Sequence, residues 1–128
     1  MTSRFVVDAS AWIEYFKGSA KGKKISEIIE NSNEIFCSSA TVAEVISKTL
    51  REGNDFNIAL THINNWSTIV NLNSETSILA GQIHFEEKKK NKDFGMLDAF
   101  VVAAAKKLNA KILTGDNDFK HFKEAVIF

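Results

Sequence analysis

Apolar and polar residues follow one another in short blocks along this chain, and the blocks have two different spacings. The first kind is a short, nearly continuous apolar run, which is typical of a strand buried on both faces. Such runs occur at residues 5–7, 35–37, 68–72, 111–114 and 126–128. We expect each of them to form a strand, with the last one at an edge of the sheet.

The blocks between these runs carry apolar residues at the spacing of an amphipathic helix. Ser10 and Ser74 are expected N-caps, Gly18 is expected to end the first helix, and residues 86–90 form a polar tail. Strands that alternate with helices, without a long polar linker, predict one α/β domain over residues 1–128. Its central sheet should be mainly parallel and flanked by helices. The helices are expected at 10–17, 25–29, 41–52, 55–66, 74–90 and 97–108.

Composition narrows the class of protein without naming its chemistry. The formal net charge is zero at pH 7, so this chain does not coat nucleic acid by bulk charge. The single cysteine, Cys37, lies in an apolar stretch and is expected to be a small buried side chain. The N-terminal apolar run is interrupted by Asp8, and the run at 99–105 is too short to span a bilayer. We expect a cytoplasmic protein that makes no membrane contact.

Acidic residues fall at the predicted carboxyl ends of strands, where ligands gather in parallel α/β sheets. Asp8 ends the first strand, Glu44 follows the second, and Asp116 follows the fourth, with Asp118 two residues later. Asp98 opens the strongly apolar helix 97–108. Carboxylates that converge repel one another unless a cation lies between them, and Mg²⁺ and Mn²⁺ prefer oxygen ligands. The pattern therefore predicts a site for a hard divalent cation.

Each of these acids also has a structural interpretation. Glu44 lies three residues after Thr41, which is the spacing of a helix capping box, and the spacing favours neither interpretation. Asp98 would complement the dipole at a helix start, and Gly115-Asp116-Asn117-Asp118 suits any tight turn. Asp8 is the hardest to explain structurally, because it follows a buried run with no basic residue nearby in sequence.

Four sequence blocks resemble the motifs of the PIN-domain family, in the order of that family and over nearly the whole chain. The best match is to the VapC-like ribonuclease toxins of type II toxin–antitoxin systems. The resemblance implies a PIN-like fold, a Mg²⁺ or Mn²⁺ cofactor, and catalytic metal ligands at Asp8, Glu44, Asp98 and Asp116. It also implies supporting roles for Ser10, Thr114 and Asp118. The blocks are Val7–Gly18 (VDASAWIEYFKG), Thr41–Val45 (TVAEV), Leu97–Ala105 (LDAFVVAAA) and Leu113–Phe119 (LTGDNDF).

The function that follows from the resemblance is hydrolysis of RNA phosphodiester bonds by metal-activated water. In-line attack by water is expected to leave 5′-phosphate and 3′-hydroxyl ends. The expected partners are an RNA substrate, a cognate antitoxin that covers the acidic site, and a second copy of the chain in a homodimer. A housekeeping RNA-processing nuclease, or a PIN-like module that binds RNA or a partner without catalysis, remains an alternative.

Two other chemistries fit the sequence less well. A metal-free ribonuclease would use a histidine pair, but His62, His84 and His121 belong to no pattern connected with the acids. A phosphoacceptor receiver domain has a similar size, but it carries paired acids after its first strand and an Asp after its third. Here Asp8 stands alone and residues 71–73 contain no Asp, so the receiver interpretation fails.

Two groups of side chains are compatible with RNA contacts but are more typical of ordinary structure. Lysines near helix ends usually form solvated faces, although each group here is long enough to hold an RNA backbone. Trp12, Tyr15 and Phe16 have helical spacing and are expected in the core or in a dimer contact rather than as a base-stacking surface. The lysine groups are Lys17, Lys21, Lys23 and Lys24, and Lys88, Lys89, Lys90 and Lys92.

Overall fold

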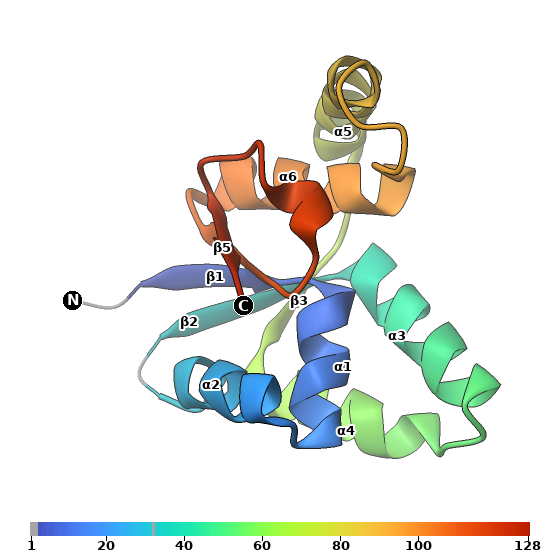
Figure 1. Ribbon diagram of the computed structural model, residues 1–128, viewed down its shortest axis with the longest axis vertical. Coiled ribbons are helices and arrows are strands. Elements are labelled where there is room, and N and C mark those ends of the chain that lie inside the picture. Colours follow the sequence, from blue (N-terminus) through green and yellow to red (C-terminus); the bar gives the residue numbers. More distant parts are fainter. Residues whose placement is uncertain (1–2, 32) are drawn as a thin grey trace.

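A five-stranded sheet, parallel throughout, runs through the centre of the computed structural model (Figure 1), which describes residues 3–31 and 33–128. The strand order is β3-β2-β1-β4-β5. This architecture confirms the predicted α/β class and parallel sheet. The predicted domain 1–128 includes residues 1, 2 and 32, which lie outside the described residues. The strands are β1 (Arg4–Val7), β2 (Glu34–Ser38), β3 (Thr68–Val70), β4 (Lys111–Thr114) and β5 (Ala125–Ile127).

Helices cover both faces of the sheet (Figure 1). On one side lie α1 (Ala9–Lys17), α2 (Ala20–Ile29), α3 (Ser39–Arg51) and α4 (Phe56–Trp66). On the other side lie α5 (Ser74–Lys88), α6 (Met96–Leu108) and the short 3₁₀ helix η1 (Asn117–Phe119). None of the helices in residues 3–31 and 33–128 has the length and apolarity that a membrane span requires.

Alternate side chains of β1 enter two different apolar clusters, because successive residues of a strand point to opposite faces. Phe5 and Val7 pack with α1 to α4, whereas Val6 packs with α5 and α6. The neighbouring β4 divides in the same way, with Leu113 in the first cluster and Ile112 in the second. The two central strands are therefore buried on both faces, which explains their nearly continuous apolar sequences.

The register between β1 and β4 determines what meets at the carboxyl edge. Val7 is opposite Leu113, and the backbone amide of Asp8 donates to the Leu113 carbonyl at 2.9 Å. The residues that follow, Asp8 on one strand and Thr114 on the other, therefore lie side by side. The adjacency of these two strands also separates this fold from a receiver domain, in which β1 lies between β2 and β3.

Two local predictions, both of N-caps, were wrong. Asp8, not Ser10, is the N-cap of α1, and Asn73, not Ser74, caps α5 by accepting from the Thr76 amide. The polar tail expected at 86–90 includes Glu87, which is only 4% exposed because it packs against His121. Gly18 does end α1, with a left-handed φ of 64°.

The remaining structural expectations concern Cys37 and Trp12, and both are confirmed. Cys37 is fully buried, and burial raises the pKa of its thiol to about 12, so it is neutral. Trp12 is also fully buried and stacks on Phe16 with 5.9 Å between ring centroids. A base-stacking role for Trp12 is therefore wrong, since no part of its ring reaches the surface.

Candidate metal centre

The acidic site begins with a hydrogen-bonded connection between the ends of β1 and β4. Asp8 is 4% exposed, and its Oδ2 accepts from the Ser10 hydroxyl at 2.7 Å and from the Thr114 hydroxyl at 3.0 Å. Burial raises the pKa of Asp8, and the two hydroxyl hydrogen bonds oppose that shift. The Ser10 and Thr114 oxygens are 3.1 Å apart. The structure thus brings Asp8, Ser10 and Thr114 together in one buried group.

The same two hydroxyls hold the turn that follows β4. Ser10 Oγ accepts from the Gly115 amide at 3.0 Å, and Thr114 Oγ1 accepts from the Asp116 amide at 2.9 Å. Each hydroxyl therefore connects the Asp8 carboxylate to a backbone amide of the acidic turn.

Asp116 and Asp118 are oriented by the turn itself. Asp116 Oδ1 accepts from the Asp118 amide at 2.9 Å, which is the cap of η1. The Asp118 carboxylate in turn accepts at 3.0 Å from the side chain of Asn91, which lies in the loop before α6. Asn91 was not among the residues predicted from sequence. An isolated loop asparagine carries no motif, so only the tertiary structure connects it with the acidic turn.

Glu44 lies in the second turn of α3, because that helix begins earlier than the sequence suggested. Ser38 is its N-cap and accepts from the Ala40 amide at 3.2 Å, so the capping-box interpretation of Thr41 and Glu44 is wrong. The Glu44 carboxyl is free to face the other acids. Burial, followed by the charges of Asp8, Asp98 and Asp116, raises its pKa to about 7, and Lys48 opposes the shift.

Asp98 lies in the first turn of α6, and its Oδ2 accepts from the Gly95 amide at 2.8 Å. Asp98 therefore has the structural role at a helix start that the sequence suggested. That role does not account for the surroundings of the carboxyl, however. Burial raises the pKa of Asp98 to about 6, with further increases from Asp8, Asp116 and Asp118.

The four predicted ligands come from four separate elements, and the charges of Asp8 and Asp116 contribute to the raised pKa of both Glu44 and Asp98. Asp8 comes from the end of β1, Glu44 from α3, Asp98 from α6 and Asp116 from the turn after β4. Within the described chain, no three His, Cys, Asp or Glu side chains are arranged closely enough to hold a metal ion as they stand. The donor set nevertheless fits a hard divalent cation, because it offers only oxygen atoms and because neighbouring acids contribute to the raised pKa of Glu44 and Asp98.

The three histidines lie in separate surroundings. His62 on α4 contacts the rings of Tyr15 and Phe16, and His84 on α5 stacks on Phe94. His121 Nδ1 lies 2.5 Å from Glu87 Oε2. Each ring therefore has its own aromatic or carboxylate neighbour, an arrangement typical of structural histidines.

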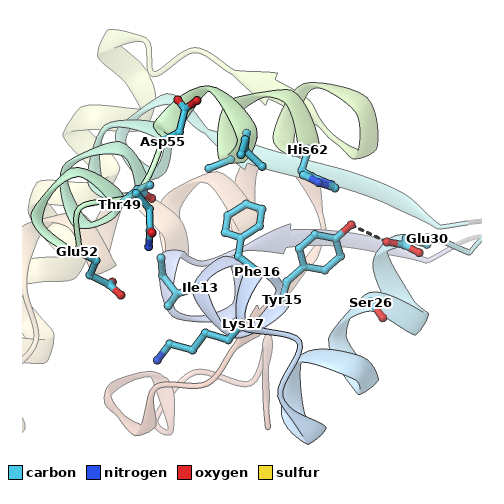
Figure 2. Close-up of a pocket in the computed structure, with 13 residues that line it drawn as sticks. Ile13, Tyr15, Phe16, Lys17, Ser26, Glu30, Thr49, Glu52, Asp55 and His62 are labelled. Carbon is cyan, nitrogen blue, oxygen red and sulfur yellow. Dashed lines mark hydrogen bonds between the residues drawn. The ribbon is translucent and has the colours of Figure 1, made fainter.

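A cavity lies between α1, α2, α3 and α4 (Figure 2). This cavity of about 640 Å³ has Ile13, Tyr15 and Phe16 of α1 among its lining residues, with His62 across from them. The Tyr15 hydroxyl donates to Glu30 Oε2 at 2.5 Å, and burial together with that carboxylate raises the pKa of Tyr15. None of the four predicted metal ligands lines the cavity, so the cavity and the acidic site are chemically distinct.

Comparison with known proteins identifies the fold over nearly the full chain. The model of the family described as PIN domain matches residues 5–125. No curated protein matches the chain by sequence.

Solved structures of toxin–antitoxin proteins are similar to this one. VapBC2 from Rickettsia felis, bound to a DNA fragment from its promoter, has a TM-score of 0.75 and 17% identity, over 98% of this chain and 97% of that one. A toxin–antitoxin complex from Klebsiella pneumoniae has a TM-score of 0.76 and 18% identity, over 94% of each chain. VapC20 from Mycobacterium tuberculosis, a toxin that cleaves the sarcin–ricin loop, has a TM-score of 0.76 and 14% identity, over 93% of this chain and 95% of that one.

Proposed function

This chain belongs to the PIN-domain family, whose members are nucleases that generally use a divalent metal, and from that premise we propose that it is a Mg²⁺- or Mn²⁺-dependent endoribonuclease. We further propose that it is the toxin of a toxin–antitoxin pair. Asp8, Glu44, Asp98 and Asp116 are the proposed metal ligands and catalytic residues. Ser10, Thr114 and Asp118 are their proposed supports.

One observation carries this proposal: at a single sheet edge, acids from other elements add to the effect of burial in raising the pKa of both Glu44 and Asp98. Such a group destabilises the folded state unless protons or a cation reduce the repulsion. Near neutral pH, a divalent cation does this more completely than a single proton. The site is therefore built at a cost in stability, which is typical of a functional centre.

The contacts of each side chain in this site indicate its proposed role. Asp8 is fixed by the Ser10 and Thr114 hydroxyls, so one of its oxygens has a set position before substrate arrives. Glu44 and Asp98 have only partial burial, so they remain accessible for binding a cation and for orienting a water molecule. Bound there, a divalent cation supplies neutralisation of phosphate charge and lowers the pKa of a coordinated water. In-line attack of water on the phosphorus, with cleavage of the bond to the 3′-oxygen, would leave 5′-phosphate and 3′-hydroxyl ends.

The proposed partners follow from the solved structures with the same fold. Those from Rickettsia felis and Klebsiella pneumoniae contain a toxin together with its antitoxin. We propose that this chain likewise binds a cognate antitoxin that covers the acidic site, forms a homodimer and acts on RNA in the cytoplasm.

The experiment that tests this function is cleavage of total cellular RNA, with the ends mapped, by the wild type and by Asp98→Asn. Each protein is assayed with Mn²⁺ and with a chelator. Cleavage that requires both Mn²⁺ and Asp98, and that leaves 5′-phosphates, is the expected result. Expression of the wild type without its antitoxin should also arrest growth, which distinguishes a toxin from a housekeeping nuclease.

Two outcomes would contradict the proposal. If the folded, antitoxin-free wild type cleaves no RNA in Mn²⁺, the chain is a PIN-like binding module. If cleavage persists in chelator, the acidic cluster is not the active site, and the histidines become the first residues to test.

A further inference from the structure

A lysine, Lys21, lies near the acidic site and has no role in the proposed metal binding. Two glycines, Gly22 and Gly115, determine its position. Gly22, in the first turn of α2, is buried directly against α1. A methyl group on Gly22 would lie 2.0 Å from the carbonyl oxygen of Glu14, so no side chain fits at that position. The first turn of α2 therefore approaches α1 as closely as two backbones can.

Ser19 strengthens this junction. Its hydroxyl donates to Glu14 Oε2 at 2.6 Å and accepts from the Gly22 amide at 2.9 Å, so it caps α2 and ties that cap to α1. The residues between Ser19 and Gly22 consequently have a fixed position relative to the start of α1. One of them is Lys21.

Lys21 extends from this junction to the acidic turn. A methyl group placed on Gly115 would lie 3.7 Å from Lys21 Cδ, 4.0 Å from Lys21 Nζ and 3.8 Å from Ser10 Oγ. The methylene stem of Lys21 thus lies along Gly115, where the absence of a side chain leaves room for it. The ammonium group of Lys21 and the hydroxyl that holds Asp8 thus both lie within 4.0 Å of that methyl position.

The ammonium group of Lys21 is not used within the described part of the chain. No hydrogen bond or ion pair from Lys21 to a carboxylate occurs there, whereas Lys106 pairs with Glu124 at 2.9 Å. The cation that opposes the raised pKa of Glu44 is Lys48, not Lys21. Lys21 therefore offers a free positive charge at the rim of a site that is otherwise acidic.

From this geometry we infer that Lys21 binds a non-bridging oxygen of the RNA phosphate that lies at the acidic site. The inference rests on the proposed nuclease function and adds a substrate-binding residue to it. A phosphate entering this site meets four carboxylates, which repel it. A lysine held at the rim offsets part of that repulsion and fixes which side of the phosphate faces the acids.

Lys23 provides the matched control, because it has the same charge, is also exposed and is only two residues from Lys21 in α2. Successive residues of a helix are about 100° apart, so Lys23 points about 200° away from Lys21. Lys21→Met keeps the stem that lies on Gly115 and removes only the charge. Lys21→Arg keeps a charge at the same place and should restore most of the binding.

The test measures binding separately from cleavage. Fluorescence anisotropy with a labelled single-stranded RNA, in the Asp98→Asn background with Mn²⁺, gives the affinity over a range of KCl concentrations. Lys21→Met should weaken binding about tenfold, the size expected for a hydrogen bond to a charged group. It should also reduce the slope of log affinity against log salt by about 0.7, the value of one contact with a single strand. Lys23→Ala should change neither quantity.

Cleavage by the same lysine variants in an otherwise wild-type chain separates the possible failures. Lys21→Met should reduce kcat/KM about tenfold while the melting temperature stays unchanged. If the wild type cleaves RNA and Lys21→Met matches it in affinity and salt slope, only the assignment of Lys21 is overturned. An equal loss in Lys23→Ala would also overturn it, since the effect would then be one of bulk charge. If the wild type neither binds nor cleaves RNA, the nuclease function fails and the assignment fails with it.

Discussion

Helix α1 contributes to the acidic site at one end and to the apolar and aromatic cavity at the other. At its N-terminal end, Ser10 supports a cluster of carboxylates whose charges contribute to the raised pKa of Glu44 and Asp98. At its C-terminal end, Tyr15 and Phe16 line the cavity of about 640 Å³, whose acids lie around a mainly apolar and aromatic wall (Figure 2). The cavity is therefore the site with the less distinctive chemistry.

The difference teaches how a functional site is recognised in a small fold. In the cavity, Glu30 has a partner in the Tyr15 hydroxyl, and Glu52 and Asp55 are exposed to water. At the strand ends, the charges of neighbouring acids contribute to the raised pKa of Glu44 and Asp98. The volume of a cavity shows where a ligand has room to bind. Repulsion between neighbouring carboxylates instead indicates where a cation or a proton stabilises the folded protein. The following predictions test that distinction.

The largest expected effect is at Glu44 in α3, and Glu52, the C-cap residue of that helix, is its control. Glu44→Gln, at the acidic site, should reduce Mn²⁺-dependent RNA cleavage more than about a hundredfold, since even residues that only orient metal ligands change activity by about 10- to 100-fold. Glu52→Gln, at the cavity end of α3, should leave the rate within about twofold. Single-turnover cleavage of a short RNA measures both. Equal losses in the two variants would mean that the cavity takes part in catalysis.

An intermediate effect is expected at the junction between α1 and α2. Gly22→Ala should lower the free energy of unfolding by about 1–3 kcal/mol, because its methyl group would overlap the Glu14 carbonyl and force α2 away from α1. Gly81→Ala, on α5 where a methyl group meets open space, should instead raise it by about 0.5–1 kcal/mol. Urea denaturation measures both changes. A tolerated Gly22→Ala would show that the contact between the helices is adjustable.

The smallest expected effect is the pH dependence of the metal-free protein. The folded pKa is about 7 for Glu44 and about 6 for Asp98, against ordinary values of 4.5 and 3.8. The folded state thus binds more protons than the unfolded state between those values, so stability should fall as pH rises through this range. The fall should be on the order of 1 kcal/mol per carboxyl, because solvent screens both half-exposed groups.

Melting curves between pH 4.5 and pH 7.5 measure this dependence, with and without Mn²⁺. The cation should raise the melting temperature most at the upper end of the range, where the carboxylates have lost their protons. The Glu44→Gln variant should show a flatter profile without metal. A wild-type profile that rises toward pH 7.5 in the absence of metal would contradict the clustering of the carboxyls.

Sequence reasoning predicted the strands and the acids at their ends, because both follow from local patterns. It did not give the order of the strands. The contact of Asp8 with Thr114 depends on β1 pairing with β4, and no local pattern specifies which strands are neighbours. The resemblance to a known family supplied what local physics alone left open. The catalytic roles of the acids remain predictions.

The errors have a common physical origin. Asp8 and Ser10, like Asn73 and Ser74, are pairs of good cap residues close together, so propensity alone does not choose between them. Glu87 belongs to a strongly charged segment and is buried only because His121 returns to it from a distant part of the chain. The placement of Lys21 likewise depends on the contact between Gly22 and Glu14, which involves two helices.

The pairing of β1 with β4 also determines when this protein acquires its chemistry during synthesis. Asp8 and Thr114 are 106 residues apart, so Asp8 leaves the ribosome long before its hydrogen-bond partner has been made. Until residues 111–118 emerge, β1 has no neighbour on that side and Asp8 has no fixed orientation. Such distant strand pairing is also slow to form. The nascent chain therefore lacks the acidic site until β4 has joined the sheet, which leaves a cell time to supply a protein that restrains it.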